Sequence, residues 1–326
     1  MSQKIVPNES IKAYKAFDKN FKCRGFQYEV GETYHIDDEV EICRKGFHAC
    51  QNCMDVLRYY PLNDSRFAEV EVWGDVVFSE NDGKLCASDI KIVRELTFHE
   101  LFAESYEYFS ENNKVNGDKF RLISSKTASD KHDCEFLLYE YTASTLSTNG
   151  TNVKVISDDR EVVISTSGRD STIFSKGAEA NVATLGSLGK VGSFGRQSKI
   201  ISSSIYGEIK SFGENSIIAS VGNDSSVSSN GKKSIVLSVG KNSIAKAKKG
   251  NWITLAEYGK NGPICVKTEY VDGKKIKGDT WYKLKNRKFV EVDMWTKVKI
   301  RNYSMKYLLI SDFFLTFAVY SRNKIY

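Results

Sequence analysis

The sequence predicts a mixed architecture, in which a small α+β N-terminal domain precedes a parallel β-solenoid of nine-residue repeats that is capped by a small antiparallel β-sheet. Three observations lead to this fold class. The chain holds 23 glycines but only 3 prolines, and glycine recurs every nine residues from Gly150 to Gly240. Residues 1–125 instead carry short apolar stretches of varied spacing. A fixed repeat of this length is typical of a solenoid, whose stacked coils bury one continuous core.

Eleven nine-residue units follow one another from Gly150, with Asp159 and Ser204 in place of two glycines. The sixth residue of each unit is Ile or Val except for Ala245, the fourth is small or Val, and the eighth is Ser, Thr or Ala. These positions share one face of a strand, because side chains alternate along an extended chain. Two units per coil predict five to six coils, with the first glycine of each unit at a corner that needs a positive φ or a tight turn. Calcium-binding nonapeptide repeats carry recurring carboxylates, which are missing here, so we exclude a calcium roll.

Both ends of a solenoid need a cover. Trp252, Leu255 and Tyr258 are too bulky for the narrow interior, so we expect the solenoid over 150–249 and the antiparallel cap over 250–294. Residues 295–326 form an apolar and basic tail. Its apolar run is shorter than the about 20 residues that span a bilayer, so we expect it to be an add-on or a docked terminal segment, with a weak membrane-surface anchor as the less favoured alternative.

The N-terminal part, 1–125, is expected to be an α+β recognition domain, joined to the solenoid by a connecting helix within 126–149. Its clearest strand is FAEVEVWGDVV, which alternates apolar and polar residues. Thr97-Phe98-His99-Glu100 is a capping-box pattern that predicts a helix start. The expected strands are 13–17, 25–34, 46–50, 67–77 and 90–96, and the expected helices are 51–60, a helix from Thr97, and 131–146.

The net charge is +6, but its distribution is uneven. Residues 241–301 hold 16 Lys/Arg against 6 Asp/Glu. Many of these lysines alternate with apolar residues, which favours a solvated strand surface over a nucleic-acid site. The first residues lack the apolar core of a signal peptide, and the seven cysteines form no regular framework. We therefore expect reduced thiols in the cytoplasm, without a membrane partner.

Two groups of residues suggest catalytic or metal chemistry. Cys43, His48, Cys50 and Cys53 have a spacing that could close a zinc site, but the second C-x2-C half of a zinc module is missing, so buried free cysteines are the competing interpretation. Glu69 and Glu71 share one strand face and could act as an acid/base pair, although such a pair is more often a solvated strand face.

The order of elements around G-F-H-A at Gly46–Ala49 resembles the middle of the ADP-ribosyltransferase fold of poly-ADP-ribose polymerases. The resemblance implies NAD as cofactor, a nicotinamide cleft at Gly46–Ala49, and Tyr59 or Tyr60 nearby. The family places a Glu on a late strand, but Ile90–Val93 lacks one. His48, Tyr59, Glu69 and Glu71 are then the catalytic candidates.

Three further motifs resemble an uncharacterised family of phage and prophage proteins: CRGFQYEVG at 23–31, CRKGFHAC at 43–50 and DTWYKL at 279–284. That resemblance covers about 1–295 and implies a virus-derived protein in a bacterial cell. The family brings no established activity.

We therefore expect a non-enzymatic binding and oligomerisation protein that requires no cofactor. Its N-terminal domain would recognise a host protein or a small nucleotide-type ligand, as a host-defence antagonist, and its solenoid would be a rigid homo-oligomeric stem. The expected ligand-binding residues are Arg24, Gln27, Tyr28, His48 and Tyr60. The alternatives are an NAD-dependent ADP-ribosyltransferase-like enzyme and a structural component of the virion.

Overall fold

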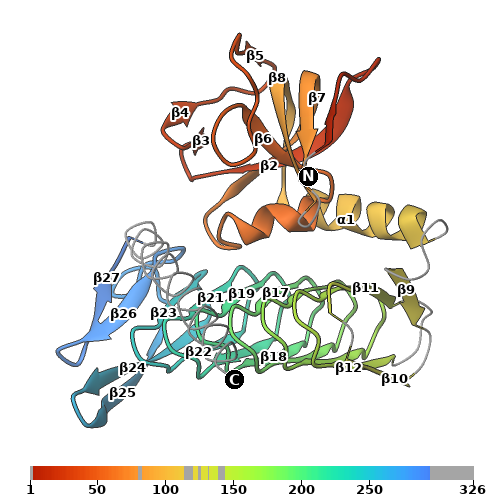
Figure 1. Cartoon of the computed structure of the whole chain (residues 1–326). Coiled ribbons are helices and arrows are strands. Elements are labelled where there is room, and N and C mark those ends of the chain that lie inside the picture. The colour runs from red at the N-terminus through yellow and green to blue at the C-terminus, as the bar shows by residue number, and fades with distance from the viewer. Residues whose placement is uncertain are drawn as a thin grey trace, which may run out of the picture. The chain divides into compact units, whose positions relative to one another are not determined.

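The computed structural model describes residues 3–79, 83–113, 120–123, 126–130, 132–138 and 144–293. The described residues up to Val290 form one compact unit. Within this unit, an N-terminal module (residues 3–113) packs against one side of a β-solenoid (Figure 1). None of the helices in the described ranges is long and apolar enough to cross a membrane. The expected tail over 295–326 lies outside the described residues.

Four strands of the N-terminal module form a closed ring, which we also call the barrel. The first, β2 (Ile11–Phe17), pairs with β6 (Phe47–Cys50) and β7 (Arg66–Phe78). β8 (Lys84–Leu96) pairs with β6 and β7 and completes the ring. The strands expected over 67–77 and 90–96 are thus confirmed, within longer β7 and β8. Accessory strands are β1 (Gln3–Ile5) beside β7, β5 (Thr33–His35) beside β8, and the pair β3 (Lys22–Cys23) and β4 (Phe26–Gln27).

Alternation along these strands fills the ring, because one face of each strand points inward. The interior holds small residues beside large ones, as a narrow closed sheet requires. Its fully buried members include Ala13, Phe17, Ala68, Val70, Val72, Val76, Leu85, Ala87, Ile90 and Ile92.

Two helical elements connect the ring to the solenoid. The helix expected over 51–60 is the 3-10 helix η1 (Cys53–Arg58), which is shorter than predicted and ends before Pro61. The helix α1 (Phe98–Asn113) begins as predicted. The Thr97 backbone N–H donates to a carboxylate oxygen of Glu100 at 2.7 Å, and the Glu100 N–H donates to the Thr97 hydroxyl at 3.2 Å. This reciprocal capping box satisfies two donors at the helix start.

The solenoid is built from two parallel sheets, confirming the expected repeat fold. We call the first the module-facing sheet; its strands are β9 (Phe120–Ile123), β11 (Glu135–Leu138), β13 (Lys154–Ser157), β15 (Thr172–Ser175), β17 (Lys190–Ser193), β19 (Glu208–Ser211), β21 (Ser226–Ser229) and β23 (Ile244–Ala247). We call the second the outer sheet; its strands are β10 (Lys126–Ser129), β12 (Thr145–Thr148), β14 (Val163–Thr166), β16 (Asn181–Thr184), β18 (Lys199–Ser202), β20 (Ile217–Ser220), β22 (Ile235–Ser238), β24 (Trp252–Gly259) and β25 (Gly262–Tyr270). At the end of the module-facing sheet lie β26 (Tyr282–Lys285) and β27 (Lys288–Glu291).

The interior of the solenoid follows the predicted pattern. The sixth residue of each unit, such as Ile200, Ile209 and Ile218, is at most 2% exposed. The eighth residue, such as Ser193 and Ser211, is also buried on the same face. Small residues stand beside the β-branched column because opposite walls of a narrow coil lie close together.

Of the two alternatives for the first residue of each unit, a positive φ or a tight turn, the positive φ is wrong. The left-handed residue is the third, which is never glycine; examples are Asn152, Leu188 and Lys233, with φ of 56°, 61° and 55°. Glycine is needed at the first position for another reason: a Cβ on Gly213 would overlap the carbonyl oxygen of Gly195 in the preceding coil. Close approach of two backbones therefore selects glycine, while the turn itself tolerates other side chains.

The connecting helix predicted over 131–146 is also wrong. The described residues there form β11 and β12, which pair with β13 and β14. Cys134, Phe136 and Leu138 alternate and point into the solenoid core. Their large size hid the repeat, because the other coils use smaller side chains at two of these positions.

The solenoid also ends later than predicted. β24 pairs in parallel with β22, with Ile253 opposite Val236 and Leu255 opposite Ser238, before it turns into the antiparallel pair with β25. The spacing between these coils is 17 residues instead of 18, which broke the nine-residue frame in the sequence. Trp252 is no obstacle to the coil because its side chain lies on the outside, 48% exposed.

The loop after η1 joins the module to the solenoid at three successive residues. The Leu62 N–H donates to a carboxylate oxygen of Glu208 at 2.5 Å. The Asn63 amide oxygen accepts from the Ser228 hydroxyl at 2.7 Å. Asp64 accepts from both the Lys246 ammonium and the Trp281 indole N–H, each at 2.5 Å. The outward side chains of the module-facing sheet are therefore mostly buried and polar.

Candidate functional site

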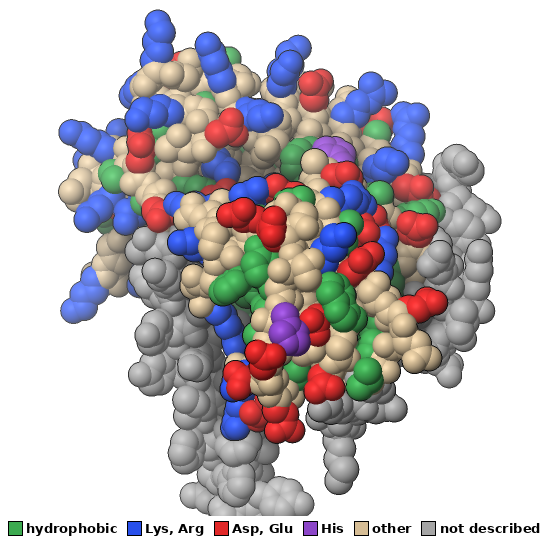
Figure 2. Space-filling view, turned by 90° about the horizontal axis from the view of Figure 1, so that it is seen from above, with side chains coloured by type: hydrophobic (Ala, Val, Ile, Leu, Met, Phe, Trp, Pro, Cys, Tyr) green, Lys and Arg blue, Asp and Glu red, His purple; other side chains and the backbone are tan. Residues whose placement is uncertain are grey.

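Charged side chains of both signs intermingle on the side of the molecule that carries the N-terminal module (Figure 2). One cluster in this module brings three cations together. Its members are Lys15 on β2, Arg24 between β3 and β4, and Lys84 at the start of β8. They approach the loop 43–48 from three different elements, and we call them the cationic cluster.

Two members of the cationic cluster bind this loop through its backbone. The Lys15 ammonium donates to the carbonyl oxygen of His48 at 2.6 Å, and the Arg24 guanidinium donates to the carbonyl oxygen of Cys43 at 3.1 Å. The Lys84 ammonium lies 3.1 Å from the Cys43 sulfur. Among the described residues, no carboxylate pairs with Lys15 or Arg24. Lys15 is nevertheless only 4% exposed, so a positive charge is buried there without a counter-charge from the part of the chain that the structure describes.

His48 holds the same loop in place. Its Nε2 accepts from the Cys43 backbone N–H at 2.8 Å, and its Nδ1 faces the Gly46 carbonyl oxygen at 3.1 Å. These partners assign the proton to Nδ1 in a neutral ring. Both ring nitrogens are thus engaged by backbone groups, which suits a structural role better than that of a general base.

The electrostatics of His48 agree with a neutral ring. Burial, followed by the nearby charges of Lys15, Arg24 and Lys84, lowers the pKa of His48 to about 4. A ring that stays neutral at pH 7 can keep accepting the Cys43 N–H. The three charges of the cationic cluster add to the effect of burial.

Aromatic side chains border the cationic cluster. The Lys15 ammonium lies 5.2 Å from the centre of the Tyr28 ring, and the Lys84 ammonium lies 4.8 Å from that of Tyr59. Both distances fit cation–π contacts. Phe26 packs edge-on against Tyr28 and Tyr34 and is 48% exposed. Flat apolar surface is therefore available next to positive charge.

The predicted ligand-binding residues occupy different parts of this region. Arg24, Tyr28 and His48 belong to the cationic cluster or touch it. The Gln27 amide donates to the carbonyl oxygens of Tyr28 and Asn20 and so fixes the β3–β4 turn. Burial raises the pKa of Tyr60, whose hydroxyl contacts Cys23.

The structure does not bring the four zinc candidates together. Cys50 and Cys53 are buried in the apolar cluster beneath the barrel, whereas Cys43 is exposed. The Cys86 thiol instead lies 3.7 Å from Nδ1 of His48. The described ranges contain no group of three or more His, Cys, Asp or Glu side chains that could hold a metal ion. The alternation of β6 and the turn into η1 separate the four residues.

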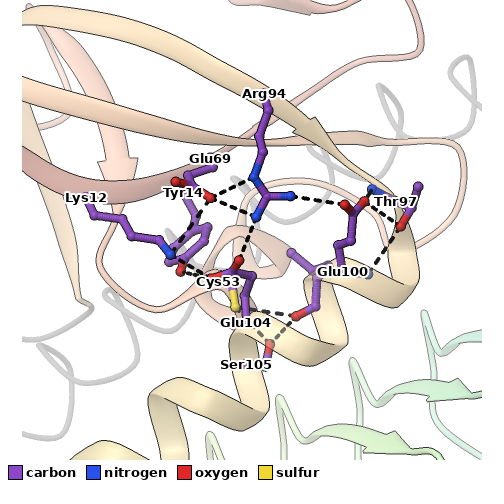
Figure 3. Close-up of polar contacts among 10 residues, drawn as sticks. Lys12, Tyr14, Cys53, Glu69, Arg94, Thr97, Glu100, Glu104 and Ser105 are labelled. Atoms are coloured by element: carbon purple, nitrogen blue, oxygen red, sulfur yellow. Dashed lines mark hydrogen bonds and ion pairs between the residues drawn. The ribbon is translucent and has the colours of Figure 1, made fainter.

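The carboxylate candidates lie elsewhere on the ring. Glu69 accepts from the Arg94 guanidinium at 3.0 Å, and Arg94 also contacts Glu100 and Glu104 at 3.1 and 2.7 Å (Figure 3). Glu104 further accepts from Lys12 at 2.8 Å and from the Tyr14 hydroxyl at 2.7 Å. This network ties α1 to the barrel, so Glu69 has a structural role.

Glu71 stands opposite Lys12 on β2 and Lys91 on β8. The Lys12 ammonium lies 3.8 Å from a carboxylate oxygen of Glu69. The alternating pattern of the strand predicted a shared face for the two carboxylates, and cations of the neighbouring strands stand beside both positions.

Sequence reasoning missed Lys15 and Lys84. Lys15 lies between Tyr14 and Ala16 in an alternating stretch, where a lysine usually points to solvent. It is buried because β2 and β6 meet at Tyr14 and Cys50, which brings the His48 carbonyl within reach. No local pattern reports this long-range pairing.

Comparison with known proteins places the site within a recognised domain. Residues 11–104 match the family model described as a domain of unknown function, DUF7666. The match includes the barrel, η1, the cationic cluster and the start of α1, whereas the solenoid lies outside it. No curated protein and no solved structure matches the chain.

Proposed function

We propose that the N-terminal module binds a small anionic ligand of nucleotide type at the cationic cluster, and that the solenoid serves as its rigid support. The observation that carries this proposal is the buried ammonium of Lys15, which has no carboxylate partner among the described residues. A buried charge without a counter-charge costs free energy, and an incoming anion would offset that cost.

The exposed members of the site favour a phosphate as that anion. The Arg24 guanidinium is exposed and uses NH1 for the Cys43 carbonyl, and its planar fork retains other N–H donors that suit phosphate oxygens. Lys84 adds a second charge next to the exposed sulfur of Cys43. Two converging cations over a backbone loop are a common way to hold a phosphate.

The neighbouring aromatic rings favour a base or another planar group attached to the phosphate. Tyr59 is 41% exposed and Phe26 is 48% exposed, although both lie beside charged or aromatic partners that fix their positions. A nucleobase gains about 1 to 3 kcal/mol from stacking on such a ring. Charge and stacking together select a nucleotide over a simple carboxylate.

The resemblance to phage and prophage proteins extends the proposal to a biological setting. The ligand would then be a nucleotide of the bacterial host, sequestered by a virus-encoded protein as a defence against host signalling. Binding alone suffices for this role. An NAD-consuming enzyme at the same loop is the alternative, and the experiment below separates the two.

Calorimetric titration of the full chain with NAD, ADP and pyrophosphate tests the proposal. We expect at least one of these probes to bind the wild type, with affinity that falls as salt rises. Arg24→Ala and Lys15→Met should each weaken binding at least tenfold. Lys91→Ala, which removes an exposed lysine of β8 outside the cluster, is the matched control and should leave the affinity unchanged.

Cys43 provides a second readout, because its exposed sulfur lies inside the site. A bound probe should slow alkylation of Cys43, measured by mass spectrometry, without slowing that of Cys265. Failure of the wild type to bind any of the three probes would contradict the nucleotide proposal. Unchanged binding in both cluster variants would show that the site lies outside the cationic cluster. Consumption of NAD would favour the enzyme alternative.

A further inference from the structure

The two sheets of the solenoid carry outward side chains of opposite character. On the module-facing sheet, the fifth residues of the units include Lys154, Lys190 and Glu208, which are polar yet at most 7% exposed. On the outer sheet, the fifth residues include Ile217 and Ile235, which are apolar yet 45% and 44% exposed. The apolar outward face is therefore the one that the N-terminal module leaves uncovered.

The apolar residues of the outer sheet form one continuous surface. Parallel register aligns Ile217 with Ile235 and Ile235 with Trp252, and the antiparallel pair of β24 and β25 adds Tyr270 beside Trp252. The members of this surface, which we call the outer apolar face, are Val163, Ala183, Leu185, Ile201, Ile217, Ala219, Val221, Ile235, Leu237, Trp252 and Tyr270.

The outer apolar face is almost free of charge. Of the outward side chains of β14, β16, β18, β20, β22 and the parallel part of β24, only Lys199 is charged, although 27% of the whole chain is charged. A contiguous apolar patch of several hundred Å² is uncommon on a monomer and marks an interaction surface. A nucleic acid or an anionic membrane would need more than one cation, so the partner surface is apolar as well.

We infer that the outer apolar face is the interface of a homodimer, in which a second copy of the chain places the same face against it. The first argument is the repeat. Apolar outward side chains line up in columns along the sheet, with Ile217 beside Ile235 in one column and Ile201, Ala219 and Leu237 in the next. These columns share one repeat of about 4.8 Å, and a second copy is a partner that has the same repeat.

The second argument is area. The seven outer-sheet strands from β14 to β25 span roughly 34 Å at about 4.8 Å each, and three outward columns span roughly 15 to 20 Å, which gives roughly 500 to 700 Å² per copy. Two copies bury roughly 1,000 to 1,400 Å², which reaches the lower part of the range of about 1,200 to 2,000 Å² for specific interfaces. We therefore expect a reversible dimer with a dissociation constant in the micromolar range.

Symmetry locates the centre of the interface. A two-fold axis that relates two identical faces passes near the middle strand, which is β20 among these seven. Ile217 and Ala219 on β20 then lie close to their counterparts in the second copy. A charge at residue 217 would face its own copy across the axis, so both desolvation and repulsion would oppose association.

Sedimentation equilibrium of the full chain from 1 to 100 µM tests the inference. The wild type should change from 36.8 kDa to twice that mass over this range. Ile217→Glu should weaken self-association at least tenfold while thermal unfolding stays cooperative. Val30→Glu, which changes a 50% exposed valine of the N-terminal module, is the matched control and should leave the dimer intact.

A positive test uses Ala219→Cys. Mild oxidation should cross-link two copies through residue 219, identified by the disulfide-linked peptide in mass spectrometry. A wild type that is monomeric at 100 µM would overturn the inference, and so would an Ile217→Glu variant that still dimerises with wild-type affinity. Cross-links at other cysteines without any at residue 219 would assign the dimer to a different surface.

Discussion

The ammonium of Lys154 on β13 lies 2.6 Å from a carboxylate oxygen of Asp55 in η1 and 2.7 Å from one of Glu135 on β11. All three side chains are less than a tenth exposed. Burial alone lowers the pKa of Lys154, but the two carboxylates outweigh it and raise the pKa. An ion triad therefore fixes the N-terminal module to the first coils of the solenoid.

Replacement of Lys154 by Met should destabilise the protein by about 3 to 5 kcal/mol, because two buried carboxylates lose their cation. Chemical denaturation measures this loss. The triple variant Asp55→Asn, Lys154→Met, Glu135→Gln removes all three charges and should recover most of the stability. If Lys154→Met alone has no effect, the triad does not hold the two parts together.

His48 should titrate far below its ordinary range. Its pKa of about 4 follows from burial and the cationic cluster, so the unfolded chain binds a proton between pH 6.5 and 4 that the folded chain does not. His48 therefore costs the free energy of unfolding nothing above pH 6.5, and lowers it progressively as pH falls towards 4. Nitrogen-detected NMR should show the neutral Nδ1–H form at pH 7, and Lys15→Met should raise the midpoint. A midpoint near 6.5 in the wild type would contradict the described surroundings.

Lys210 should be a source of instability. Burial, followed by the charge of Lys246, lowers its pKa to about 8 where it lies 4.9 Å from the Phe98 ring of α1. Because the unfolded chain binds the proton more tightly, this site gains stability as pH rises from 8 to 10.5. Lys210→Met should stabilise the protein at pH 7 by about 1 to 2 kcal/mol, after the loss of the cation–π contact is subtracted. Thermal unfolding of both proteins at pH 7 and pH 10 tests this, since the difference should shrink at the higher pH.

Substitution of the glycine and substitution of the left-handed residue of the repeat should have opposite effects on stability. Gly213→Ala places a methyl group against the Gly195 carbonyl and should cost at least about 3 kcal/mol, because two coils must move apart. Lys233→Gly removes strain at φ 55° and should be neutral or stabilising by up to about 1 kcal/mol. Equal destabilisation by both changes, as measured by urea unfolding, would argue against this division of roles.

Local patterns predicted much of this fold for a clear reason. The column of Ile and Val at every ninth residue has one use, which is to fill the interior of a narrow coil, and Ile209 and Val227 lie there as expected. The capping box at Thr97 depends only on residues three apart and was also predicted. The prediction failed at the two coils that depart from the frame, those of Phe136 and Ile253.

The candidate site was less predictable, because its residues are joined by pairing between distant strands. Arg24, Tyr28 and His48 stood out as polar or aromatic residues of short motifs, but the charge that matters most, Lys15, looked like an ordinary surface lysine. Its role depends on β2 meeting β6 and on the path of the loop 43–48.

The sequence by itself determined the solenoid, because a repeated backbone conformation requires the same small set of side chains at every turn. Only the tertiary structure decided which face of that solenoid is covered. The outward positions of both sheets follow the same repeat, yet Lys154 and Glu208 are buried by η1 and the loop after it, while Ile217 and Ile235 remain exposed. That choice rests on contacts between residues far apart in the chain, which no local pattern encodes.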